Sequence, residues 1–270
     1  MLKFRLFSGK SARKMELLAL VLLLLAAAPR AWGGFEITDS DGKPISPEGG
    51  NYTITGDNHD VLSISNANGL QNAVISGEGK SIDVSGSDVN LTLKNLTVSA
   101  DSDTALKLNV ADNGKANIEI DGTVTLSSGT GNKYHGFWIS STNGFVVLNA
   151  VSEDSILRAI GNSAHGLYFQ SGNSTLLLQG DGKFDCVGGW AGEYDGLACY
   201  GDLYVGGSVT LSAAGSGGRT SKQRTFFTSG SFTLFENAKV IDAYSVDARG
   251  GGVNIMGSAF IAEDIIVNKG

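Results

Sequence analysis

Short runs of alternating apolar and polar residues recur along the chain after residue 34. Examples are NLTLKNLTVS (90–99), ANIEIDGTVTLS (116–127) and STLLLQGDGKFDC (174–186). Each run is bounded by Gly, Asn, Asp or Ser, and period-two alternation between such residues is typical of β-strands. Helical periodicity is scarce in the same region. The pattern therefore predicts an all-β fold.

The chain also repeats itself at a longer period. GNKYHGFWIS (131–140) and GNSAHGLYFQ (161–170) lie thirty residues apart and share most of their pattern. Self-similarity at 20–50 residues is the signature of a solenoid, and units made only of strands indicate coils of a β-helix. We predict a right-handed, single-stranded parallel β-helix with coils of about 21–31 residues. One apolar position marks successive coils: Leu106, Phe137, Leu167, Leu197, Phe227 and Val253.

Stacked coils bring equivalent residues into columns about 4.8 Å apart. Because side chains alternate along a strand, one set is expected to point into the core: Leu106/Leu108, Phe137/Ile139, Leu167/Phe169 and Leu197/Cys199. The residues between them should point outward: Lys107, Trp138, Tyr168, Ala198 and Thr228.

Residues 1–33 differ from the rest of the chain. Basic residues precede the apolar run Leu17–Ala28, and Ala31-Trp32-Gly33 offers a small-residue cleavage site. This order is typical of a secretory signal peptide, with a retained membrane anchor as the alternative. We expect residues 34–51 to form an N-terminal cap and 52–270 the β-helix, in a secreted or cell-surface protein. AEDIIVNKG (262–270) shows no cap, so the last coil ends bluntly or associates end to end with another chain.

The net charge of the chain limits the classes of partner that it can bind. Without the six basic residues and one acidic residue of the leader, 14 basic and 26 acidic residues remain, a net charge of −12. Such a surface argues against nucleic acid, which requires a basic footprint.

The only cysteines, Cys186 and Cys199, fall at inward positions on two strands of one coil. They can form a disulfide across the core or pack as free thiols.

The stretch VNLTLKNLTVSADSDTALKLN (89–109) resembles the coil motif of secreted bacterial proteins of the pectate-lyase-like β-helix superfamily. In particular, it looks like their carbohydrate-binding, non-catalytic branch. The resemblance is looser over residues 110–257. It implies binding of extracellular polysaccharide, or adhesion, by a bacterial protein.

Adjacent outward aromatics supply a candidate site for such a ligand. Trp138 and Tyr168 should lie side by side, and flat rings with a polar tip suit the apolar face of a sugar. The alternative is that long loops fold back and bury the rings. Nearby loops add further aromatics to this sugar platform: Tyr134, Trp190 and Tyr194.

Signals for metals and catalysis are weaker. His135, His165 and Asp195 share a column, but two rungs separate its ends, so three metal bonds cannot be formed. We expect these residues to end a loop, with Gly136, Gly166 and Gly196 supplying unusual backbone angles. Asp101 and Asp103 could bind Ca²⁺ weakly, although an ordinary turn explains them. No cofactor is expected.

Catalytic patterns of the superfamily are also missing. The basic residues Arg219, Lys222 and Arg224 share a loop without clustered aspartates, and no paired carboxylates fall on one face. We therefore expect a glycan-binding protein or adhesin rather than an enzyme. A lyase or hydrolase acting on acidic glycans and a structural spacer without a ligand remain as alternatives.

Overall fold

The computed structural model is built from β-strands, and Trp32–Gly270 forms one compact unit. Every regular element in the described part of the chain is a strand, 23 in all. No helix among those residues is long and apolar enough to cross a membrane. The structure describes residues 35–39, 41–45, 48–49, 52–56, 61–67, 70–131, 133–171, 173–189, 194–215, 226–250 and 252–269.

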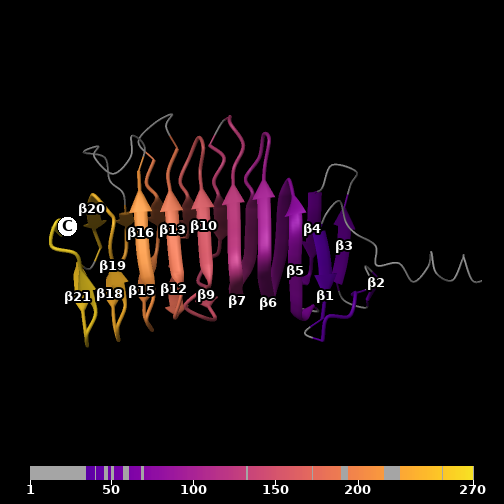
Figure 1. Ribbon diagram of the computed structural model, residues 1–270, viewed down its shortest axis with the longest axis horizontal. Helices are drawn as coiled ribbons and strands as arrows, with labels where there is room; N and C mark the ends of the chain where they lie inside the picture. The colour runs from indigo at the N-terminus through magenta and orange to yellow at the C-terminus, as the bar shows by residue number, and fades with distance from the viewer. Residues whose placement is uncertain are drawn as a thin grey trace, which may run out of the picture. The chain divides into compact units, whose positions relative to one another are not determined.

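Within this unit the chain winds as a parallel β-helix with three faces per coil, and the strands of successive coils stand side by side (Figure 1). The long strands β6 (Ser81–Ser99) and β7 (Leu106–Ser127) run unbroken around all three faces. β5 (Gln71–Gly79) pairs with the later part of β6.

The remaining parallel strands each belong to one face. The first face contains β4 (Val61–Ser65), β8 (Phe137–Ser140), β11 (Leu167–Gln170), β14 (Leu197–Cys199), β17 (Phe226–Thr228), β20 (Ser245–Ala248) and β23 (Ile266–Lys269). The second face contains β9 (Phe145–Ala150), β12 (Thr175–Gly180), β15 (Asp202–Val205), β18 (Phe232–Leu234) and β21 (Val253–Ile255). The third contains β10 (Ile156–Ile160), β13 (Lys183–Val187), β16 (Thr210–Ala214), β19 (Lys239–Val240) and β22 (Phe260–Ile261).

The predicted interior column is confirmed. Phe137 pairs with Leu167 and Leu167 with Leu197, and all three side chains are fully buried. Repeat lengths along this column run from 20 residues, between Leu62 and Ile82, to 31, between Leu106 and Phe137. Because loops leave the stack sideways, this variation does not disturb the register.

The phase of the column was predicted wrongly beyond Leu197. The next coil is 29 residues long, so Leu197 pairs with Phe226 and not with Phe227. Phe227 therefore takes the outward position, and Thr228 lies in the core, where its hydroxyl donates a hydrogen bond to the Gly201 carbonyl at 2.9 Å. Val253 does not continue the column either; it pairs with Phe232 on the second face.

Antiparallel strands cover the N-terminal end of the β-helix. β1 (Phe35–Thr38) pairs with β5, and β3 (Tyr52–Gly56) pairs with β4 and with β2 (Glu48–Gly49). Antiparallel pairing thus extends to Gly56, and the first parallel strand is β4. Strand direction therefore reverses at this side, where the parallel stack begins.

Both cysteines are free thiols buried in the core. Cys186 lies on the third face and Cys199 on the first. Burial raises the pKa of the Cys186 thiol and raises that of Cys199 to about 12. Both therefore pack as small neutral apolar groups.

Candidate functional site

The outward side of the first face carries an aromatic strip, which we define as Trp138, Tyr168, Tyr200 and Phe227. Strand register places Trp138 next to Tyr168 on adjacent rungs, as predicted, and both side chains are half-buried. The indole Nε1 of Trp138 donates a hydrogen bond to Oε1 of Gln170 at 3.1 Å. Because the two strands pair in parallel, residues that are thirty positions apart in the sequence lie side by side.

Tyr200 continues the strip over a rung that has no outward ring of its own. Ala198 occupies the outward slot beside Tyr168 and is fully buried. The Tyr200 ring, 42% exposed, lies 5.7 Å from that of Tyr168 in an edge-on arrangement and 5.2 Å from that of Phe227. It bridges the two neighbours and leaves Phe227 only 5% exposed. Burial, with a contribution from Tyr200, raises the pKa of Tyr168, so this hydroxyl stays protonated.

An ion pair borders the strip at each end. Lys107 precedes Trp138 in the column, and its Nζ lies 2.8 Å from Oδ2 of Asp103. At the other end, Arg249 lies over the Phe227 ring at 5.3 Å from its centroid. The same guanidinium lies 3.3 Å from Oδ2 of Asp247. The aromatic surface is therefore flanked by neutralised charges.

Two histidines pack against Tyr168. His135 and His165 lie in the loops that lead into the first face in two successive coils. The ring centroids of His135 and His165 lie 4.3 Å and 5.1 Å from that of Tyr168, with nearly parallel planes. The backbone N–H of Asp195 donates a hydrogen bond to Nδ1 of His165 at 3.0 Å. Burial, and secondarily His165, lowers the pKa of His135 to about 3, so the His135 ring is neutral near neutral pH. These rings fix the position of Tyr168.

The glycines after this loop act differently from the prediction. Gly136, Gly166 and Gly196 do not have left-handed backbone angles. Instead, a Cβ at Gly166 would lie 2.5 Å from the carbonyl oxygen of Ala159, and one at Gly196 would lie 2.3 Å from that of Cys186. Glycine is needed here because the strand entering the first face crosses close to the strand leaving the third.

The other predicted platform residues are distributed around this site. Tyr194 lies edge-on to His165, with ring centroids 5.3 Å apart, and so joins the cluster behind Tyr168. The backbone N–H of Tyr134 donates a hydrogen bond to Oγ of Ser163 at 3.3 Å, and its ring lies beside Gly131. Trp190 falls outside the described residues. Loop residues therefore cover part of the Tyr168 ring, while Trp138 and Tyr168 both stay partly accessible to solvent.

Sequence reasoning missed Tyr200, Phe227 and Arg249. Tyr200 has the same strand parity as Ala198, so a second outward position could have been read from DGLACY (195–200). The outward position of Phe227 could be predicted only with the true length of the preceding coil, which is 29 residues. Arg249 is recognised only from its contact with the Phe227 ring, and no pattern in the sequence indicates that contact.

Within the described ranges, no three His, Cys, Asp or Glu side chains come together in a group that could hold a metal ion. The turn carboxylates form ion pairs with lysines: Asp101 with Lys80 at 3.2 Å and Asp103 with Lys107. The basic loop residues Arg219, Lys222 and Arg224 lie outside the described part.

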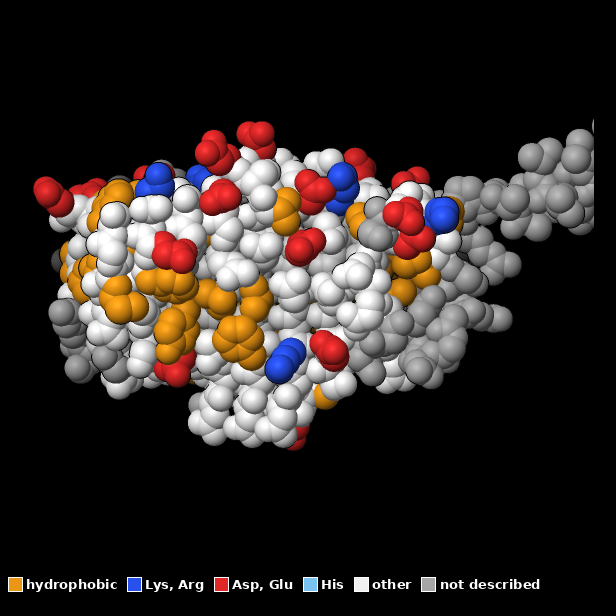
Figure 2. All heavy atoms as spheres, turned by 90° about the horizontal axis from the view of Figure 1, so that it is seen from below, with side chains coloured by type: hydrophobic (Ala, Val, Ile, Leu, Met, Phe, Trp, Pro, Cys, Tyr) orange, Lys and Arg blue, Asp and Glu red, His pale blue; other side chains and the backbone are white. Residues whose placement is uncertain are grey.

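A second apolar row lies on the outer side of the second face. Val147, Leu177 and Tyr204 are in register on β9, β12 and β15, and each is half-buried. Phe145, at the start of β9, is 40% exposed. Figure 2 shows one side of the molecule on which hydrophobic side chains gather toward the C-terminal coils, with most charged side chains along one edge.

No family model matches the chain, and no curated protein or solved structure is significantly similar to it.

Proposed function

We propose that this chain is a secreted bacterial β-helix protein that binds extracellular polysaccharide, as an adhesin or surface-binding protein. The proposal rests on the aromatic strip, which aligns four rings over four consecutive rungs of one face. The leader-like residues 1–33 support export. The coil motif in residues 89–109 supports kinship with the carbohydrate-binding branch of the pectate-lyase-like superfamily.

The strip has the chemistry that a sugar chain requires. Aromatic faces pack on the apolar C–H face of a pyranose, while the Tyr hydroxyls and the Gln170 amide offer hydrogen bonds at the ring edges. Trp138, Tyr168 and Tyr200 lie on successive rungs about 4.8 Å apart, so a sugar chain laid along the axis can contact each of them, while the buried Phe227 packs against Tyr200. Several weak contacts in a row then add through their effective concentration.

Charge favours a neutral glycan. The cations next to the strip, Lys107 and Arg249, are already paired with Asp103 and Asp247. A polyanionic chain would also meet a protein with a large excess of acidic residues. Neutral hexose or N-acetylhexosamine polymers are therefore the expected class.

Binding to a glycan array, followed by affinity measurement on the best ligand, tests the proposal. Trp138→Ala should weaken binding at least tenfold, or about 1.4 kcal/mol, because a half-buried ring whose accessible part packs on the sugar is lost. The matched control is Tyr204→Ala, which removes a half-buried aromatic from the second face and should leave affinity unchanged.

Other outcomes decide between the alternatives. Equal affinity of Trp138→Ala and the parent protein would reject the strip as the binding site. Absence of any glycan ligand would favour a structural spacer. Release of unsaturated sugars from polygalacturonate with Ca²⁺ present would favour a lyase.

A further inference from the structure

A polar hollow lies at the corner between the first and second faces, toward the N-terminal coils. Its volume is about 500 Å³, and β6 and β7 supply most of its lining. Hydroxyl and amide side chains dominate this lining: Asn66, Ser85, Ser87 and Asn109. A hollow of this size falls in the range of sites that bind small molecules.

An insertion in β7 forms one wall of this hollow. Strand pairing is regular up to Gly86 and Val110, but directly beyond this pair four residues of β7 oppose one residue of β6. Ala111, the first of the four, lines the hollow. The backbone N–H of Asn113 donates a hydrogen bond to the Thr142 carbonyl at 2.9 Å. The next coil therefore holds the wall in place.

The strand register connects the hollow to the aromatic strip. One outward column on four successive rungs of the first face consists of Ser85, Asn109, Ser140 and Gln170. This polar column runs beside the strip, and its Gln170 accepts the hydrogen bond from Trp138. Because Asn109 lines the hollow, the hollow begins on the rung next to that of Trp138, about 4.8 Å away along the axis.

Polar groups of the hollow are available to a ligand. Among the described residues, the side-chain hydroxyls of Ser85 and Ser87 have no hydrogen-bond partner. Asn109 donates a hydrogen bond from Nδ2 to Oδ1 of Asp83 at 3.2 Å, which fixes the orientation of its amide. No described residue of the lining is charged. The hollow therefore suits the hydroxyl groups of a neutral sugar, which both donate and accept hydrogen bonds.

We propose that the hollow binds a further sugar unit of the neutral chain that packs on the aromatic strip, an inference that rests on the glycan function proposed above. The chain then extends from Tyr200 over Tyr168 and Trp138 into the hollow, along the rungs of β14, β11, β8, β7 and β6. At roughly one unit per rung, full occupancy requires about five units. The strip supplies ring packing and the hollow supplies hydrogen bonds, so the hollow selects for chain length.

Calorimetric titration of the full chain with a length series of the best array glycan tests this proposal. The parent protein should bind chains of about six units at least tenfold more tightly than chains of about three units, which the strip alone accommodates. Ser85→Ala/Ser87→Ala should weaken binding of the long chains at least fivefold, through roughly two lost hydrogen bonds, and leave the short chains unaffected. The matched control is Ser76→Ala/Ser99→Ala, which also removes one half-buried and one exposed serine hydroxyl, both outside the hollow, and should change neither affinity.

The outcomes separate failure of the hollow from failure of the strip. If Ser85→Ala/Ser87→Ala binds chains of every length as the parent does, while Trp138→Ala still weakens binding, the hollow is not a sugar site and the proposed function stands. Equal weakening of short and long chains by the serine variant would also overturn the inference, because the hollow would not bind an added unit. No effect of Trp138→Ala at any length, or the absence of any glycan ligand, would overturn both proposals.

Discussion

At the residue scale, the aromatic strip depends on positions that contact two rungs at once. Tyr200 lies between Tyr168 and Phe227 and covers the rung whose outward residue is Ala198. His135 and His165 pack on Tyr168 in the same way, from loops thirty residues apart. Single side chains therefore link neighbouring coils through ring contacts. Among them, the protonation state of His135 affects the stability of the packed cluster.

His135 makes stability depend on pH. Its pKa is about 3 in the folded protein, against 6.5 in an unfolded chain. The unfolded state binds more protons between these values, so the free energy of unfolding falls as the pH drops below 6.5. At pH 5 the loss is roughly 1–2 kcal/mol, since one pKa unit corresponds to 1.36 kcal/mol.

Urea unfolding at pH 7 and pH 5 measures this effect. His135→Gln removes the titrating group, so its free energy of unfolding should fall less between the two pH values than that of the parent. Equal falls in both proteins would show that His135 does not carry the pH dependence.

At the element scale, the interior columns hold the coils in register. Each rung contributes one inward residue per column, and strand pairing transmits the register along the first face from Leu62 to Val267. Stability then arises from nearest-neighbour contacts between coils, as in other solenoids.

The same substitution at two rungs of one column tests this view. Val246 is fully buried, whereas Val267, its partner in the next coil, is 37% exposed. Val246→Ala should cost about 2–3 kcal/mol through lost burial and cavity formation. Val267→Ala should cost under ~1 kcal/mol, because less of this side chain is buried. Similar costs at both positions would contradict the open end of the core.

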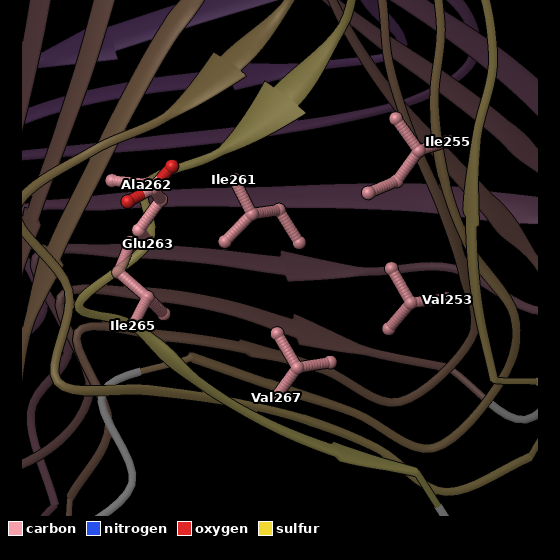
Figure 3. Close-up of a pocket in the computed structure, with 7 residues that line it drawn as sticks. All are labelled: Val253, Ile255, Ile261, Ala262, Glu263, Ile265 and Val267. Atoms are coloured by element: carbon pink, nitrogen blue, oxygen red, sulfur yellow. The ribbon is translucent and has the colours of Figure 1, made fainter.

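At the scale of the whole unit, the two ends differ. Antiparallel strands cover the N-terminal end, whereas among the described residues β21, β22 and β23 each pair with one strand only and surround a hollow lined by apolar side chains and Glu263 (Figure 3). A stack of rungs frays from an end that is paired on one side only.

Amide hydrogen exchange should show this asymmetry. In dilute solution β23 is expected to exchange fastest among the first-face strands, and β8 and β11, paired on both sides, slowest. Uniform exchange along the first face would contradict a stack that frays from the C-terminal end.

The amino-acid sequence by itself determined the local structure: the alternation predicts the strands, and the thirty-residue recurrence predicts their stacking. It therefore also placed Trp138 beside Tyr168, because parity and period suffice for neighbouring positions. These properties depend only on the geometry of an extended backbone, which repeats every two residues.

Only the tertiary structure decided which residues face inward after Leu197, because one residue fewer in a loop gives Phe227 an outward-facing position and places Thr228 in the core. It also decided that Gly166 and Gly196 allow close approach of backbones, and that Tyr200 and Arg249 complete the strip. Loop length and contacts between rungs follow from packing in three dimensions, and no local pattern in the sequence encodes them.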